Sequence, residues 1–150
     1  MNPLIPRVGT AAAAVIGAAA LVAAGPHDVT RPRLEKSLDA TFVNLYLEQQ
    51  HRILGHAAVT AASTGASTTC HRTASSTDVG AGPDWVCHVL WRDDKGAKQD
   101  GKFEVAAKAN YCYVASGPSK IVGLQTIADT TGRQVPNPLF EFDACYDPAS

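Results

Sequence analysis

The chain has 150 residues, of which 45% are hydrophobic and 18% are charged, and its formal net charge is −1. This length indicates a single domain. A charge balance so close to zero gives no field that would favour nucleic acid or an anionic membrane surface as a partner.

The N-terminal segment is typical of a secretory signal. Arg7 is its only charged side chain, and residues 8–24 form an uncharged run. The small residues of Val22-Ala23-Ala24 suit the narrow pocket of signal peptidase. We therefore expect residues 1–24 to be a signal peptide cleaved after Ala24. One alternative is an uncleaved signal anchor, although the run is shorter than the roughly 20 apolar residues of a spanning helix. The other is a buried helix of the fold.

The next segment predicts one long amphipathic helix, from Pro32 to Leu54. Its apolar side chains recur every three or four residues, at Leu34, Leu38, Phe42 and Leu45. Pro32 suits a first turn, Thr30 or Asp28 can cap it, and Gly55 can end the helix. Residues 56–69 contain no large side chain and predict a flexible linking segment.

The stretch Asp84–Trp91 predicts a strand with one core face. Its residues alternate strictly, with one set on the first face (Trp85, Cys87, Val89, Trp91) and the other set on the second (Val86, His88, Leu90). Residues 93–101 predict a polar turn, with Asp100-Gly101 as the tight-turn pair. The alternation in Lys102–Val114 predicts the partner strand of a hairpin.

Shorter strands are expected on both sides of this hairpin. One is expected around Thr68–Arg72 and another over Ile121–Ala128. The residues Asp129–Gly132 predict a turn, and Leu139–Tyr146 predict a final packed segment. Together these elements predict an α+β domain over residues 25–150, with one long N-terminal helix packed on a four- to five-stranded antiparallel sheet.

The four cysteines predict two disulfides, because an even number in an exported chain is typical of a disulfide framework. We prefer the sequential pairing of Cys70 with Cys87 and of Cys112 with Cys145. A nested pairing, Cys87 with Cys112 inside Cys70 with Cys145, stays open. It does so because Cys87 and Cys112 lie at comparable distances from the predicted hairpin turn.

No constellation in the sequence predicts catalysis, a cofactor or a metal ion. Cys87 and His88 are adjacent on a strand, so they point to opposite faces and do not converge on one ion. We expect His51 and His56 to be solvated surface residues. We expect the same of the carboxylates of Asp93 and Asp94, and Glu141 and Asp143 are expected on the solvent face of an edge strand. We expect most of the aromatic residues to form the core.

Three sequence motifs carry a family resemblance: D-W-V-C (Asp84–Cys87), N-Y-C-Y (Asn110–Tyr113) and N-P-L-F-E-F-D-A-C-Y-D (Asn137–Asp147). With the signal and the helix, they resemble small exported actinobacterial proteins of unknown function, which implies no activity. The chain is also similar, more weakly, to the secreted subtilisin-inhibitor family through its four cysteines and Asn110-Tyr111-Cys112. The helix before the first cysteine and the sequence after Cys112 depart from that family.

These observations predict an uncharacterised exported domain of the cell envelope or the extracellular space. Its function is expected to be non-enzymatic binding of a protein, a cell-envelope component or a small ligand. Contact with a membrane is expected only through an uncleaved N-terminal segment. The alternative is a secreted protease inhibitor with a reactive segment at Asp93–Gly101 or Gly117–Lys120. An enzyme would require a concave pocket with convergent polar groups.

Overall fold

One long helix and one antiparallel sheet make up the body of the structure, a computed structural model that describes residues 28–146. The helix α1 (Arg31–Glu48) continues into a π-helical segment, η1 (Gln49–Ile53), which confirms the predicted helix. Thr30 is the N-cap residue, as expected, although its side chain makes no capping hydrogen bond. The expected signal segment, residues 1–24, lies outside the described residues.

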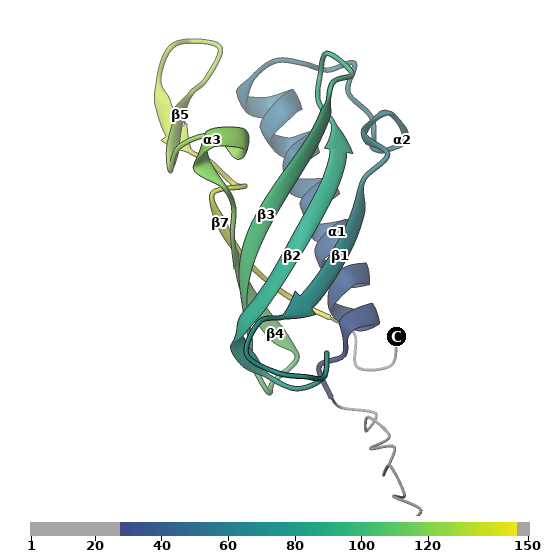
Figure 1. Cartoon of the computed structure of the whole chain (residues 1–150). Helices are drawn as coiled ribbons and strands as arrows, with labels where there is room; N and C mark the ends of the chain where they lie inside the picture. Colours follow the sequence, from purple (N-terminus) through teal and green to yellow (C-terminus); the bar gives the residue numbers. More distant parts are fainter. Residues whose placement is uncertain (1–27, 147–150) are drawn as a thin grey trace, which may run out of the picture.

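Five strands form the main sheet in the order β1-β2-β3-β4-β7, and every neighbouring pair is antiparallel. The strands of this sheet are β1 (Ser67–Arg72), β2 (Gly82–Arg92), β3 (Lys98–Ala107), β4 (Cys112–Ser116) and β7 (Glu141–Cys145). A small second sheet pairs β5 (Thr126–Ala128) with β6 (Gln134–Pro136). Helix α1 crosses one face of the main sheet and leaves the other face open (Figure 1). The fold is therefore α+β, as predicted.

The core lies between α1 and the sheet. The apolar stripe of the helix is buried, including Leu34, Leu38 and Phe42 at 0% exposure. The predicted alternation of β2 is confirmed, since Trp85, Cys87, Val89 and Trp91 are buried while Leu90 is exposed. Phe42 packs against Trp91 and Phe103, with ring centroids 4.8 and 5.8 Å away. Full burial stabilises a large apolar side chain by about 1.5–3 kcal/mol, so this seam holds the helix on the sheet.

The disulfides follow the sequential pairing, Cys70 with Cys87 and Cys112 with Cys145. In each pair the two cysteines lie directly opposite each other on neighbouring strands. The nested alternative is wrong because Cys87 on β2 and Cys112 on β4 are separated by β3. Cys70 and Cys87 are fully buried beneath the helix, whereas Cys145 is exposed.

The hairpin that joins β2 to β3 differs from the predicted one in its turn. Asp93 N–H donates to Ala97 O (2.9 Å), and Gly96 N–H donates to Asp93 O (3.0 Å), so the chain reverses here. Strand β3 begins at Lys98, which places the predicted turn pair Asp100-Gly101 within the strand. That part of the prediction is wrong, because the side chain of Asp93 organises the turn earlier.

The predicted strand Lys102–Val114 is in fact two strands. Strand β3 ends at Ala107 and β4 begins at Cys112, with a turn between them closed by Lys108 N–H donating to Cys112 O (2.8 Å). Tyr111 has a positive φ of 68°, which few side chains adopt and which reverses the chain. The residues of this turn continue the alternation of side chains seen in the two strands, so the sequence pattern did not indicate the turn.

The segment between β4 and β7 also differs from the prediction. Residues expected to open a third strand form a short helix instead, α3 (Ser119–Val122), and only β5 is extended. Pro118 precedes the helix and Gly123, with φ 99°, ends it. The predicted turn after β5 is confirmed, with Asp129 Oδ1 accepting hydrogen bonds from the N–H groups of Thr131 and Arg133.

The segment 56–69, expected to be flexible, contains the one-turn helix α2 (Ala61–Thr64) and the start of β1. Thr60 and Ser63 cap α2 reciprocally, because the Thr60 hydroxyl accepts from Ser63 N–H and the Ser63 hydroxyl accepts from Thr60 N–H. Val59 and Thr64 are buried and attach the segment to the core. Its flexibility stays a prediction.

Candidate functional site

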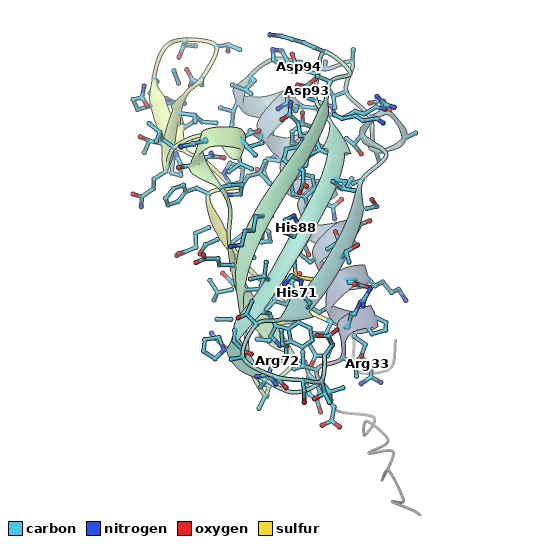
Figure 2. The ribbon with its side chains drawn as sticks, in the orientation of Figure 1. Arg33, His71, Arg72, His88, Asp93 and Asp94 are labelled. Carbon is cyan, nitrogen blue, oxygen red and sulfur yellow. A yellow bond between two sulfur atoms is a disulfide. The ribbon has the colours of Figure 1, made fainter. Side chains whose placement is uncertain are left out.

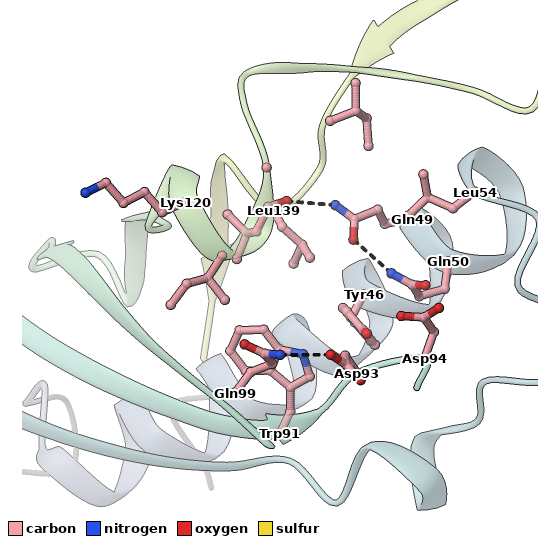
Figure 3. A pocket seen from close by; sticks show the side chains of 14 residues that line it. Tyr46, Gln49, Gln50, Leu54, Trp91, Asp93, Asp94, Gln99, Lys120 and Leu139 are labelled. Atoms are coloured by element: carbon pink, nitrogen blue, oxygen red, sulfur yellow. Dashed lines mark hydrogen bonds between the residues drawn. The ribbon is translucent and has the colours of Figure 1, made fainter. Parts of the chain in front are cut away.

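A cleft of about 410 Å³ lies at the end of the molecule where α1 finishes. Three parts of the chain enclose it: the end of the helix with η1, the β2–β3 turn, and the segment that carries α3 and β5. Figure 3 shows these parts converging on the space between them. Ligand sites are commonly concave spaces of about 300–1,000 Å³ in which apolar walls carry a few placed polar groups.

The π-helical segment η1 shapes the helical wall. Its wide turn closes with Leu54 N–H donating to Gln49 O (3.0 Å). The neighbouring residues Gln49 and Gln50 both line the cleft wall and are both 96% buried. Single π-helical turns are rare and are frequent at functional sites.

Gln49 ties the opposite wall of the cleft to the helix. Its Nε2 donates to Asn137 Oδ1 (2.8 Å) and to Val122 O (3.1 Å). Asn137 Nδ2 in turn donates to the carbonyl oxygens of Val122 and Leu124, both at 2.9 Å. Figure 3 shows Gln49 bonded across the space to this segment. The amides therefore hold α3 and the start of β5 at a fixed separation from the helix.

Gln50 extends this network toward the β2–β3 turn. Gln50 Nε2 donates to Gln49 Oε1 (3.2 Å), and Gln50 Oε1 lies 2.7 Å from His56 Nδ1. His56 Nδ1 also lies 3.4 Å from Asp94 Oδ2. His51 Nε2 lies 2.6 Å from Val59 O. The prediction that His51 and His56 are solvated is confirmed for their exposure, but both rings also hold the 55–60 segment to the helix end.

Asp93 is part of the framework of the β2–β3 turn. Its Oδ1 accepts from the N–H groups of Lys95 (3.0 Å) and Ala97 (2.8 Å), and its Oδ2 accepts from Gln99 Nε2 (2.8 Å). Burial disfavours the charged form, but these hydrogen bonds outweigh it and keep the pKa of the Asp93 carboxyl below its ordinary value. The prediction of a solvated carboxylate is therefore wrong for Asp93, which is half-buried and accepts three hydrogen bonds from its own turn.

Asp94 contrasts with its neighbour, because the contact with His56 is the one ion pair recorded for its carboxylate within the described residues. The Asp94 side chain keeps 28% of its exposure. It borders the cleft and also a second hollow of about 530 Å³, lined by Ala57, Ala58 and Val59. Asp94 thus presents a charged oxygen to both spaces.

Aromatic side chains form the floor of the cleft. Tyr46 and Trp91 pack edge to face, with ring centroids 6.1 Å apart. A Cβ at Gly101 would lie 2.9 Å from the Trp91 ring, so this position of β3 needs glycine to admit the indole. Burial raises the pKa of the Tyr46 phenol, an effect that the nearby Trp91 N–H partly offsets. Trp91 Nε1 itself is buried beside the Tyr46 hydroxyl but makes no well-formed hydrogen bond among the described residues.

The other residues considered from the sequence lie away from the cleft. His71 and His88 project from the strands of the open sheet face, far from Asp93 and Asp94 at the end of the molecule (Figure 2). His88 Nδ1 lies 2.9 Å from Asp100 Oδ1. Within residues 28–146, no group of three His, Cys, Asp or Glu side chains is placed to hold a metal ion. Glu141 and Asp143 are exposed on β7, as expected.

The polar wall of the cleft was not predicted from the sequence. Gln49, Gln50 and Asn137 were assigned no role, although Gln49 and Gln50 occupy positions where the apolar stripe of the helix ends. An adjacent pair of amides at that point was the available signal. Asn137 stands 88 residues from Gln49, and nothing in the sequence relates the two.

No protein-family model, no curated protein and no solved structure matches this chain. The geometry of the cleft is therefore the basis for any functional proposal. No helix within residues 28–146 is both long enough and apolar enough to cross a membrane.

Proposed function

We propose that this chain is an exported, disulfide-stapled domain that binds a small ligand in the cleft beside Gln50 and Asp94. The observation that carries the proposal is the composition of the cleft. One wall is apolar, with Ile121 and Ile127, and the other carries buried amides and carboxylates already held in place. Such a preformed combination orients a ligand with little loss of side-chain entropy on binding.

Export is supported by the state of the cysteines. All four are paired, and disulfides persist in oxidising compartments outside the cytosol. The signal-like residues 1–24 agree with this location. Mass spectrometry of the protein secreted by its own host tests the proposal of export. We expect a mature chain that begins at Gly25 and is 4 Da lighter than its reduced form, since each of the two disulfides removes two hydrogens. An intact N-terminus in a cytosolic fraction would contradict it.

We propose binding and not catalysis because of how the polar groups of the cleft are used. A general base needs a free lone pair within reach of the proton that it removes. The Asp93 carboxylate already accepts three hydrogen bonds, and Gln49, Gln50 and Gln99 do not titrate. Asp94 supplies charge, and the one hydroxyl among the residues lining the cleft is the phenol of Tyr46, whose pKa burial raises further above neutrality.

The alternative of a secreted protease inhibitor has less support. A protease takes its substrate as an extended segment, which adds to the enzyme as a strand. Of the two candidate segments, Asp93–Gly101 is a tight turn followed by strand β3, which pairs with β2, and Gly117–Lys120 leads into helix α3. Stoichiometric inhibition of a subtilisin-like protease that leaves the cleft unperturbed would favour this alternative instead.

A fragment titration followed by amide NMR tests binding in the cleft. Binding fragments are expected to shift the amides of the β2–β3 turn and of residues 120–127 together. The variant Ile121→Trp places a large ring at the cleft wall and is expected to abolish these shifts. The matched control is Leu90→Trp, because Leu90 is also an exposed large apolar residue (48%, against 41% for Ile121) but lies on the open sheet face. Shifts that scatter over the surface, or that survive in Ile121→Trp, would refute the proposal.

A further inference from the structure

We infer that the cleft takes a small organic cation: an ammonium or guanidinium group on an apolar body that also carries an oxygen acceptor. This inference rests on the proposed function and adds the chemical class of the ligand. It follows from three features of the lining, namely Asp94, the Trp91 side chain with its buried N–H, and the apolar wall formed by Ile121 and Ile127.

The charge of the cleft is set by its carboxylates. Asp93 and Asp94 lie together on one wall, and Lys120 is the single basic residue in the lining of the cleft. Figure 3 shows the Lys120 side chain extending away from the two carboxylates. Asp93 already accepts three hydrogen bonds, whereas one ion pair is found for Asp94, so Asp94 is the carboxylate with more capacity for a new partner. A cation that reaches Asp94 meets the charges of two carboxylates. The positive groups beside them among the described residues are Lys95, which acts on Asp93, and His56 when its ring is protonated.

A second and independent observation calls for an oxygen on the same ligand. The Trp91 side chain is 96% buried, and its Nε1 lies beside the Tyr46 hydroxyl without making a well-formed hydrogen bond among the described residues. A buried donor left unpaired costs about 1–3 kcal/mol, so an acceptor that enters the cleft beside it recovers part of that free energy. Figure 3 places the indole next to Tyr46 and Asp93, on the same side of the cleft as the carboxylates. We therefore infer that an oxygen on the ligand accepts from this donor.

The remaining wall selects an apolar body. Ile121 is 41% exposed and Ile127 is partly exposed on the wall formed by α3 and β5, and Leu54 adds a partly exposed side chain at the end of η1. Burial of such surface contributes about 25 cal/mol per Å² to binding. The second hollow shares Asp93 and Asp94 with the cleft, so a cation at Asp94 can be reached from either space.

A matched series of probes tests the cation preference. The series is 6-amino-1-hexanol, 1,6-hexanediol and 6-hydroxyhexanoate, which share a hydroxyl and a carbon chain and differ in the charge of one end. Affinities are measured by amide NMR at about pH 8, where a primary alkylamine is charged and ordinary histidines are neutral. We expect the amine to bind at least about fivefold more tightly than the diol, the factor that corresponds to one weakly screened ion pair. The carboxylate is expected to bind most weakly.

One variant tests whether the preference depends on Asp94, and one change of probe tests the oxygen acceptor. Asp94→Asn is expected to remove the advantage of the amine over the diol, while Asp143→Asn, an exposed acid of β7 outside the cleft, leaves it intact. Hexylamine, which lacks the hydroxyl, is expected to bind more weakly than the amino alcohol. Higher ionic strength is expected to reduce the preference, since the screening length falls from about 30 Å at 0.01 M to about 3 Å at 1 M.

The outcomes separate this inference from the proposal beneath it. Equal binding of all three probes in the cleft, or an unchanged preference in Asp94→Asn, would overturn the cation class and leave the binding cleft standing. Tighter binding of the carboxylate would do the same. If these probes and the fragments all fail to perturb the cleft, the cleft is not a binding site, and both fail together.

Discussion

The substitution Asn137→Ala tests whether the buried amide network holds the cleft wall. The Asn137 side chain is 95% buried and makes four hydrogen bonds, two through Nδ2 and two through Oδ1. Its removal leaves the buried Leu139 N–H without its acceptor and frees the carbonyl of Leu124. Val122 O keeps the hydrogen bond from Gln49. One unpaired buried donor together with the lost hydrogen bonds gives an expected loss of about 3 kcal/mol in the free energy of unfolding.

Urea unfolding followed by tryptophan fluorescence measures this loss, with the m-value checked for two-state behaviour. The control is Gln134→Ala, an exposed amide on β6, which is expected to change stability by less than about 0.5 kcal/mol. A double-mutant cycle with Gln49→Ala is expected to give a coupling energy of at least about 1 kcal/mol. A loss below about 1 kcal/mol for Asn137→Ala, or a coupling near zero, would refute the account of the network.

Two further predictions concern the staples of the fold. Replacing Cys112 and Cys145 by alanine opens a loop of 33 residues and is expected to lower the free energy of unfolding by about 3.7 kcal/mol, measured in urea; an unchanged midpoint would contradict this. Hydrogen bonds from Arg72 hold the pKa of the Asp84 carboxyl below its ordinary value, so this contribution to stability is present above about pH 4 and is lost as the pH falls through the folded pKa. Asp84→Asn is expected to be less stable at pH 7 and to show a shallower loss of stability below pH 4; parallel pH profiles for the two proteins would be evidence against the linkage.

Elements with one dominant period could be predicted from the sequence. The spacing of Leu34, Leu38 and Phe42 located α1, because a helix that covers a sheet must bury one stripe. The alternation around Cys87 located β2 and its buried face, because a strand with one buried face has period two. The sequential disulfide pairing was the preferred one of two that the sequence left open. The strand order was needed to exclude the nested pairing.

Two turns were placed wrongly from the sequence. Their positions depend on hydrogen bonds and backbone angles of single residues, which the period of apolar side chains does not reveal. Polar and apolar side chains continue to alternate after Ala107, although the chain reverses there. The reversal depends on a positive φ at Tyr111, and an aromatic residue rarely indicates that conformation. The β2–β3 turn depends on three hydrogen bonds to the carboxylate of Asp93, and the sequence indicated only a polar region there. Both errors moved strand ends and left the order of strands unaffected.

The cleft could not be predicted because each of its walls comes from a different part of the chain. The polar wall depends on η1, whose wide turn has no sequence period of its own, and on Asn137, which meets Gln49 only after the sheet has formed. Trp91 was correctly assigned to the core face of β2. That assignment said nothing about its N–H, which makes no well-formed hydrogen bond with the surrounding side chains.

The exposed disulfide is related to the cleft through the topology of the sheet. Cys112 and Cys145 join β4 to β7, and the residues between these strands carry α3 and β5, which supply the apolar wall of the cleft. Without the disulfide, the segment between β4 and β7 would be attached at its ends by the pairing of these two short strands. Within the segment, the hydrogen bond between the amides of Gln49 and Asn137 would attach it to the helix. The crosslink restricts the unfolded chain, and the amides fix the folded wall. The proposed export would keep this pair of cysteines oxidised and the wall of the cleft preformed.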